Sequence, residues 1–478
     1  MFYKFKNTWL VSIFVLIMIA VGGYYISLSA RDIVFMDFWR NTNLIVPRVM
    51  EGDWPWDVFW KGNFGQRNFF QLFLFAVNVK YTGLNCLWEE YAGIVVIGIS
   101  SMVLYHDTKR TLQENYQKKI GLIHQILFFP VVICLFSLNQ WEILSLQFSF
   151  AFMLRILGYI GCMILLNRAL QNGASKKQYF LIGCYTGMLI LLISQLYWPA
   201  LVIMLLIVWG IHLFRCKEKK QTIFCGVCFW IPIVLSILGY LFHLDMGNSG
   251  GSFGSFLTLI KSGDFFKAIF MMLAGSIIPQ TILAQMGQTT ALAIGALLGA
   301  IVVLCIVFFF LYNVQAKTYL PMMLCAYGLL SIPIITYGRC GRFDLFYLSA
   351  SRYCCETNLI WTGCLLTIIY LICENRKKVL CSLAAGVIVV LLLHCDKIEF
   401  GIAPYRGAGK DALLSMMQDL NSFSDEELSS FQANNAQLVR DGTDLLIKYN
   451  LNQFRHSEGN SGNTLDTVAD SATIPEGD

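Results

Sequence analysis

The run WLVSIFVLIMIAVGGYYISLS, residues 9–29, decides the fold class of this chain. It contains no charged residue and is long enough for a helix to cross about 30 Å of hydrocarbon. A helix satisfies its own backbone hydrogen bonds, which an apolar membrane core requires. We expect a retained anchor and not a signal peptide, because no convincing A-x-A cleavage site accompanies the run. Lys4 and Lys6 before it predict a cytoplasmic N-terminus.

The composition of the whole chain indicates the same class. Of 478 residues, 56% are hydrophobic and 14% are charged, which leaves too little polar surface for a soluble globule of this size. The formal net charge of +5 comes from lysines and arginines between the hydrophobic runs, so it does not indicate nucleic-acid binding. Most of the 16 cysteines lie inside those runs, and no spacing resembles a zinc site. We predict an all-α, polytopic transmembrane helical bundle.

Repetition of such runs predicts about eleven membrane spans. Alternate linkers between them carry an excess of lysine and arginine, which favours the cytoplasmic side for those linkers. The segment 265–285 would reverse this order if it crossed the membrane, so we interpret it as a re-entrant or interfacial segment broken at Gly275, Ser276 and Pro279. Residues 67–80 are too short to span and predict an interfacial amphipathic helix. The predicted spans are 9–29, 86–105, 120–138, 147–166, 179–196, 197–214, 222–242, 290–312, 319–336, 357–373 and 379–395.

This topology divides the chain into two regions. Residues 1–395 form the predicted transmembrane domain, whose first outer loop is 30–85. Residues 396–478 form a predicted extracytoplasmic tail with helices near 409–421 and 425–449. We expect disorder after about residue 456, because few apolar residues remain there. The C-terminus is therefore predicted to lie outside the cytoplasm.

The first outer loop places a carboxylate and several tryptophans beside the predicted bilayer. Asp37 follows the first span within FMDFW, where its aromatic neighbours would hold it at the interface. It either acts on a substrate presented at the membrane surface or is an ordinary solvated carboxylate. Trp39 and the other tryptophans of the loop fit the aromatic belt of a membrane protein, and stacking on a sugar ring is the alternative.

Arg155 lies near the middle of the predicted span 147–166, within FAFMLRILGY. A charge at that depth is costly and normally faces the interior of the bundle with a partner. The partner is a phosphate, a carboxylate such as Glu142, or backbone carbonyls. Arg155 therefore indicates either a structural ion pair or an internal polar cavity.

The segment YGRCGRFDLFYLSASRYCCETN, residues 337–358, places three arginines in a loop that the topology puts outside. Lysine and arginine are enriched in the cytoplasmic loops of membrane proteins, so three arginines in an outer loop suggest a specific role. Arg339, Arg342 and Arg352 carry forked guanidinium groups that suit phosphate oxygens, and a lipid phosphate is the anion expected at that depth. The alternative is pairing with Asp344, Glu356 or lipid head groups.

The predicted outer turn NQWEILSLQ, residues 139–147, is dense in polar and aromatic side chains, among them Glu142 and Gln147. A second polar group lies at the helix junction ISQLYWPAL, residues 193–201. The topology brings these groups and the arginines of 337–358 to one side of the membrane. Such convergence predicts a polar cavity at that surface.

Several motifs together resemble a group of polytopic bacterial membrane proteins related to the GT-C superfamily of glycosyltransferases. They are the Asp37–Trp39 pair after the first span, GDWPWDVFWKGNFGQR, QWEILSLQF, the WP helix junction, the GRCG and SRY sequences, and the closing LLIKYNLNQF. They occur in the same order over most of the chain. The resemblance implies a GT-C-like multi-span enzyme in the bacterial cytoplasmic membrane. It would take a sugar from a polyprenyl-phosphate carrier and transfer it outside the cytoplasm to a glycan or lipid acceptor.

The resemblance also implies roles for single residues. Asp37 holds the place of the general base, and Arg352 of the SRY sequence is the best match for binding the donor phosphate. Relatives tend to carry an acid and a histidine before an arginine where this chain has Gly65 and Gln66, which leaves Arg67 as the match. No cofactor is implied, and the need for a divalent metal is left open. The other residues predicted to contact substrate are Arg339, Arg342, Tyr353, Glu142, Gln147, Trp39 and Arg155.

Two other functions fit the same topology. A transporter or flippase for a lipid-linked glycan would use Arg155 and the cavity without chemistry, although no inverted repeat is visible. An O-antigen-type polymerase or ligase would depend on the arginines and not on Asp37. Membrane lipids are expected partners in each case.

Overall fold

The computed structural model describes residues 8–62, 66–116, 121–242, 244, 251–433 and 435–455. Two predictions fall outside the described residues. The cytoplasmic N-terminus was predicted from Lys4 and Lys6, and disorder was predicted for the segment after about residue 456. The secondary structure of the described part is α-helix and 3-10 helix, with no β-strand among its elements. The all-helical class predicted from composition is confirmed.

Ten helical segments in the described part are long and apolar enough to cross a membrane. Their positions match ten of the predicted spans, because long apolar runs are read directly from the sequence. The chain is therefore a multi-pass membrane protein. The segments are Trp9–Ser29, Cys86–Asn115, Leu122–Leu144, Ser149–Asn172, Gln195–Arg215, Lys219–Leu241, Gln288–Leu311, Leu320–Arg342, Ser351–Cys373 and Lys378–Met416.

The remaining predicted span, 179–196, corresponds to α10, Lys176–Leu192, which has 17 residues. It packs against α12, Lys219–Leu241, through glycines. A Cβ atom on Gly183 would lie 2.3 Å from the carbonyl oxygen of Phe229. Glycine is needed there because the two helix backbones approach closely, as small residues permit in membrane helices.

The predicted break in 265–285 falls between α14, Asp264–Gly275, and α15, Gln280–Met286. The two helices are bent by 120° relative to each other. Pro279 has no backbone N–H to continue a helical ladder, which explains why the first helix does not run on. The pair is either a broken span or a re-entrant loop.

The predicted boundary at residue 395 lies inside one helix, α19, Lys378–Met416. Its 39 residues correspond to a length of about 58 Å, well beyond about 30 Å of hydrocarbon. The separate helix predicted near 409–421 is mostly the end of this element. Pro404 lies within it and does not terminate it.

The chain divides into two compact units. The bundle unit comprises residues 1–30, 56–72 and 88–408. The small unit comprises 31–55, 73–87 and 409–478. This division differs from the predicted one, because much of the first outer loop groups with the C-terminal segment.

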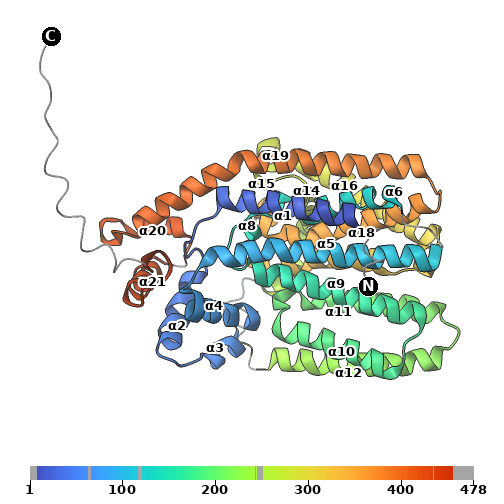
Figure 1. Ribbon diagram of the computed structural model, residues 1–478, viewed down its shortest axis with the longest axis horizontal. Helices are drawn as coiled ribbons and strands as arrows, with labels where there is room; N and C mark the ends of the chain where they lie inside the picture. The colour runs from blue at the N-terminus through green and yellow to red at the C-terminus, as the bar shows by residue number, and fades with distance from the viewer. Residues whose placement is uncertain are drawn as a thin grey trace, which may run out of the picture. The chain divides into compact units, whose positions relative to one another are not determined.

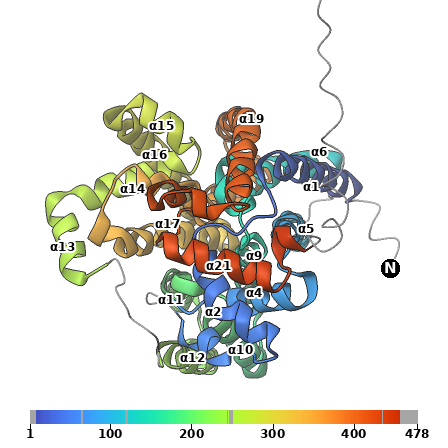
Figure 2. The same ribbon diagram turned by 90° about the vertical axis from the view of Figure 1, so that its left-hand side faces the viewer.

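The long helices of the bundle unit run in roughly the same direction, as Figure 1 shows for five of them: α1, Trp9–Ser29, α5, Cys86–Tyr116, α9, Ser149–Asn172, α11, Trp198–Arg215, and α12. Figure 2 views these helices nearly end on. Among the candidate spans, the Ser351–Cys373 segment is the most buried, since 94% of its most apolar 18-residue stretch lies inside the protein. It contains α18, Cys354–Cys373, which packs against α17, Leu320–Arg339. These two helices lead into the segment that carries the arginines.

The small unit is built on α2, Phe38–Met50, and α21, Ala436–Lys448. The carboxylate of Asp32 holds it together. It accepts hydrogen bonds from Asn452 Nδ2 and from the backbone N–H of Cys86, each 2.8 Å long, and pairs with Arg455. The LNQF motif thus has a structural role, because Asn452 within it ties the C-terminal segment to the start of the first loop.

Candidate functional site

Two arginines and two tyrosines form a cluster where α17 ends and α18 begins. Three short 3-10 helices connect α17 to α18: η5, Cys340–Arg342, η6, Tyr347–Ser349, and η7, Ser351–Tyr353. Asp344 shapes this segment, because its Oδ1 accepts hydrogen bonds from the backbone N–H of Phe346, 2.9 Å, and of Tyr347, 3.3 Å. The turn sets the position of the Tyr347 ring.

Both guanidinium groups of the cluster lie over the ring of Tyr347. The central carbon of Arg339 and that of Arg352 are each 5.1 Å from the ring centroid. Arg339 Nε also donates a hydrogen bond of 2.7 Å to the hydroxyl of Tyr353. Cation–π contacts and this hydrogen bond hold two positive charges on one aromatic platform. We call Arg339, Tyr347, Arg352 and Tyr353 the arginine cluster.

Glu142 is the carboxylate of this site. Its Oε1 lies 2.9 Å from Arg352 Nη2, with 10% of the Glu142 side chain and 24% of the Arg352 side chain exposed. Ser351 supports the pair, since its hydroxyl accepts from the Glu142 backbone N–H at 3.1 Å. Residues separated by about 210 positions thus meet, as the predicted convergence of the turn 139–147 with the arginine segment requires.

Only one of the two arginines is paired with a carboxylate among the described residues. Glu142 pairs with Arg352, whereas Arg339 contacts the rings of Tyr347 and Tyr353 and forms no ion pair there. Arg352 Nε is buried and has no hydrogen-bond partner among the described residues. A buried donor without a partner costs free energy, so an anion at this site would be favoured.

The rest of the turn 139–147 is tied into the bundle unit. Asn139 Nδ2 donates to the carbonyl oxygen of Gly275 at the break after α14, with a distance of 2.5 Å. The central carbon of the Arg406 guanidinium lies 3.7 Å from the centroid of the Trp141 ring, and Arg406 pairs with Glu399. Gln147 is buried, with 3% exposed. These contacts fix the backbone that carries Glu142.

Arg342, the third predicted phosphate ligand, is exposed at the end of η5. The arginine cluster does not include its guanidinium. Its role as a substrate ligand stays a prediction.

Asp37 lies in the small unit, directly before α2. Its side chain is exposed, and its carboxylate accepts no capping hydrogen bond from the helix that it precedes. Arg352 belongs to the bundle unit. The role of Asp37 as a base also stays a prediction.

Trp39 packs inside the small unit, and the alternative of sugar stacking stays a prediction. Its side chain is fully buried. It lies edge-on to Phe431 with ring centroids 5.6 Å apart, and a Cβ atom on Gly442 would come within 2.7 Å of its ring. The ring therefore fills the contact between α2 and α21.

Arg67 is fully buried and caps a helix, and the predicted substrate contact stays a prediction. Its Nη2 donates to the carbonyl oxygens of Tyr240, 2.8 Å, and Phe242, 2.6 Å, at the end of α12, and its Nη1 donates to Trp60. The guanidinium also lies 4.3 Å from the Trp60 ring. Burial lowers the pKa of Arg67. A cation at a helix C-terminus satisfies carbonyls that have no helical partner.

Arg155 pairs with Glu356 and not with Glu142, the carboxylate named from sequence. Both side chains of the pair are fully buried. The guanidinium of Arg155 is held between the rings of Phe152, 4.5 Å, and Tyr197, 4.3 Å. It also donates a hydrogen bond of 2.6 Å to Gln195 Oε1. The structural ion pair considered from sequence is therefore present.

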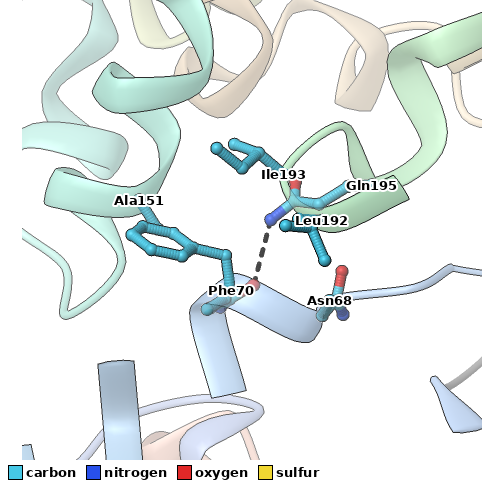
Figure 3. A pocket seen from close by; sticks show the side chains of 7 residues that line it. Asn68, Phe70, Ala151, Leu192, Ile193 and Gln195 are labelled. Atoms are coloured by element: carbon cyan, nitrogen blue, oxygen red, sulfur yellow. Dashed lines mark hydrogen bonds between the residues drawn. The ribbon is translucent and has the colours of Figure 1, made fainter. Parts of the chain in front are cut away.

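A narrow crevice lies next to this ion pair. Gln195 Nε2 donates a 3.0 Å hydrogen bond to Gln71 Oε1 across it, drawn as the dashed line in Figure 3. The crevice is too narrow to hold a water-sized space. Three amides and a phenyl ring line it, together with Ala151, Leu192 and Ile193.

Sequence reasoning missed Tyr347, Gln71 and Asn68. Tyr347 lies in the segment that was singled out for its arginines, and the aromatic residue between Arg339 and Arg352 is the signal that was available. Gln71 and Asn68 lie in the segment 67–80, which the sequence predicts to be interfacial, and no pattern in the sequence links them to Gln195.

Among the described residues, no group of three or more histidine, cysteine, aspartate or glutamate side chains has the arrangement to hold a metal ion.

No protein-family model, no curated protein and no solved structure matches this chain.

Proposed function

We propose that this protein is a membrane glycosyltransferase that moves a sugar from a polyprenyl-phosphate donor to a glycan or lipid acceptor. The observation that carries the proposal is the arginine cluster, in which Arg339 has no carboxylate partner among the described residues and Arg352 Nε has no hydrogen-bond partner there. Its residues lie at the ends of candidate spans, Leu320–Arg342 and Ser351–Cys373, where the head group of a lipid is expected.

The chemistry of this transfer suits the cluster. When the sugar leaves its carrier, the phosphate keeps the electron pair of the broken bond and gains negative charge. Arg339 and Arg352 stabilise this charge through charge-assisted hydrogen bonds. Glu142 orients Arg352, because the pair at 2.9 Å leaves the other donors of that guanidinium for the phosphate. The acceptor hydroxyl loses a proton, and the resemblance of the sequence assigns this proton to Asp37.

The experiment uses the full chain in liposomes with polyprenyl-phosphate donors that carry radiolabelled sugars. Envelope extract from a strain that lacks the gene supplies the acceptor. The proposal predicts label in the glycan or lipid acceptor from at least one donor, and loss of transfer in Arg352→Ala. Arg110→Ala, which alters an exposed arginine paired with Glu114, is the matched control and should transfer normally. Absence of transfer from every donor, or normal transfer by Arg352→Ala, contradicts the proposal.

A second candidate is a polymerase or ligase that joins lipid-linked glycans. It is favoured by one observation, namely that the arginine cluster and its carboxylate are complete within the bundle unit. Such an enzyme would need the arginines and not Asp37. An Asp37→Asn variant separates the two candidates.

A further inference from the structure

We infer that Gly275, at the break between α14 and α15, is a positioning residue that holds Glu142 against Arg352, an inference that rests on the proposed function. Both segments that carry the pair contact this glycine. The turn that carries Glu142 reaches it through Asn139, and the arginine segment reaches it through Ser349. All of these residues lie in the bundle unit.

The carbonyl group of Gly275 is available because of the proline that follows. In a continuous α-helix this carbonyl would accept from the backbone N–H four positions on, and Pro279 has none. The carbonyl oxygen accepts instead from Asn139 Nδ2 at 2.5 Å and from Cys354 Sγ at 3.4 Å. Cys354 directly follows η7, the 3-10 helix that carries Arg352. One carbonyl oxygen therefore anchors the segments on both sides of the ion pair.

The hydrogen bond from Asn139 fixes the turn on which Glu142 lies. Asn139 belongs to η2, Leu138–Gln140. Glu142 belongs to α8, Trp141–Leu144, which follows η2 without a break. A residue that holds η2 therefore also sets the position of the carboxylate.

The absence of a side chain on Gly275 gives the arginine segment its place. A Cβ atom on Gly275 would lie 2.6 Å from Ser349 Cβ and 2.8 Å from Ser349 Cα. Carbon atoms pack at about 3.5–4.0 Å, so any larger residue would push Ser349 away. Ser351, which follows closely in the chain, accepts a hydrogen bond from the Glu142 backbone N–H. A shift of Ser349 would therefore disturb the contact between Glu142 and Arg352.

The far side of the break holds the aromatic platform. Gln280, the first residue of α15, donates a 3.0 Å hydrogen bond from Nε2 to the carbonyl oxygen of Phe346. Phe346 directly precedes η6, which carries Tyr347. Phe346 also packs against a buried apolar cluster formed by Met271, Ala274, Leu283 and Ala291. The break is thus attached to the platform as well as to the ion pair.

The test is a double-mutant cycle on the unfolding of the full chain by denaturant in mixed micelles. Because Gly275→Ala separates Glu142 from Arg352, the shift of the unfolding midpoint caused by Arg352→Ala should fall to about half or less in that background. Gly183→Ala is the matched control, since a Cβ atom there would lie 2.3 Å from the carbonyl oxygen of Phe229. In the Gly183→Ala background, Arg352→Ala should keep its full effect.

Asn139→Ala is a second variant for the cycle, because it removes the hydrogen bond to Gly275 and introduces no clash. It should also reduce the effect of Arg352→Ala. Additive shifts of the midpoint in both cycles would overturn the inference. If Gly275→Ala does not fold, the Asn139→Ala cycle decides alone.

The liposome transfer assay gives a second measurement, at equal amounts of folded protein. Gly275→Ala should lower the turnover number about tenfold to hundredfold, as small misplacements of groups at a reacting centre do. Gly183→Ala should transfer normally, and normal turnover in Gly275→Ala would overturn the inference. Absence of transfer by the unaltered chain would reject the proposed function, and the unfolding cycle would still decide whether Gly275 positions the pair.

Discussion

Arg352 Nη2 lies 2.9 Å from Glu142 Oε1, and this contact joins two segments that are far apart in the chain. Glu142 lies at the end of the candidate span Leu122–Leu144, whereas Arg352 precedes the most buried helix of the bundle unit. The pair gives a partly buried carboxylate its cation and leaves Arg352 Nε without a partner among the described residues. The pair therefore has a structural consequence, and the proposed function adds a second one.

The first prediction separates these two consequences. Arg352→Ala leaves Glu142 without its cation, and the free energy of unfolding should fall by about 1–3 kcal/mol, a range reduced for partial exposure. In Arg352→Ala with Glu142→Gln, the neutral amide needs no cation, so stability should recover. Transfer of sugar should stay lost in both variants. Titration with denaturant in mixed micelles measures the first quantity, and recovery of transfer in the double variant would argue against a phosphate ligand.

The second prediction concerns Arg155 and Glu356, which are both fully buried. Glu356→Ala leaves a buried guanidinium without its anion and should destabilise the chain by about 3–5 kcal/mol. Replacing both charges, with Arg155→Met and Glu356→Leu, should cost much less than Glu356→Ala. The same denaturant titration decides this, and equal losses in the single and double variants would show that packing alone explains the effect.

The third prediction concerns Trp39. Trp39→Ala empties the contact between α2 and α21 and should cost about 3–5 kcal/mol in the small unit. Trp56→Ala is the control, because 55% of that side chain is exposed and little packing is lost. Hydrogen exchange of the α21 amides reports the change. Unaltered exchange in Trp39→Ala would contradict the assignment of this ring to the core.

The fourth prediction concerns Asp32, which accepts hydrogen bonds from Asn452 and Cys86 and pairs with Arg455. Asp32→Ala leaves three donors without this acceptor and should destabilise the small unit by about 1–3 kcal/mol. The Cys86 amide should exchange faster with solvent. Equal exchange in Asp32→Ala and the unaltered chain would mean that other contacts hold the C-terminal segment.

The membrane-spanning helices were predictable because their signals are local. An apolar run such as 9–29 is sufficient to predict α1, and Gly275, Ser276 and Pro279 are sufficient to predict the break between α14 and α15. The 39-residue helix α19 was divided wrongly, because hydropathy falls after residue 395 while nothing there ends a helix. Hydropathy predicts which part of a helix lies in the membrane, and it does not predict the residue at which the helix ends.

The candidate site was predictable only in part, because its contacts join distant residues. The arginines of 337–358 were singled out from the sequence because they lie in a predicted outer loop. In the structure, Arg352 forms an ion pair with Glu142. The partner of Arg155 lies 201 positions away, so no local pattern identifies Glu356. Trp39 reads as an interfacial tryptophan in its own segment, and only α21 shows that it belongs to a core.

We propose that this protein transfers a sugar with Arg352 on the phosphate and Asp37 as base. The most direct measurement compares Asp37→Asn and Arg352→Ala with the unaltered chain in the liposome transfer assay, at equal amounts of folded protein. We expect the unaltered chain to transfer label from a polyprenyl-phosphate sugar and each variant to lose transfer. Normal transfer by Asp37→Asn would contradict the assigned base and favour the polymerase or ligase. Movement of the lipid-linked sugar across the membrane without any transfer would contradict the account as a whole.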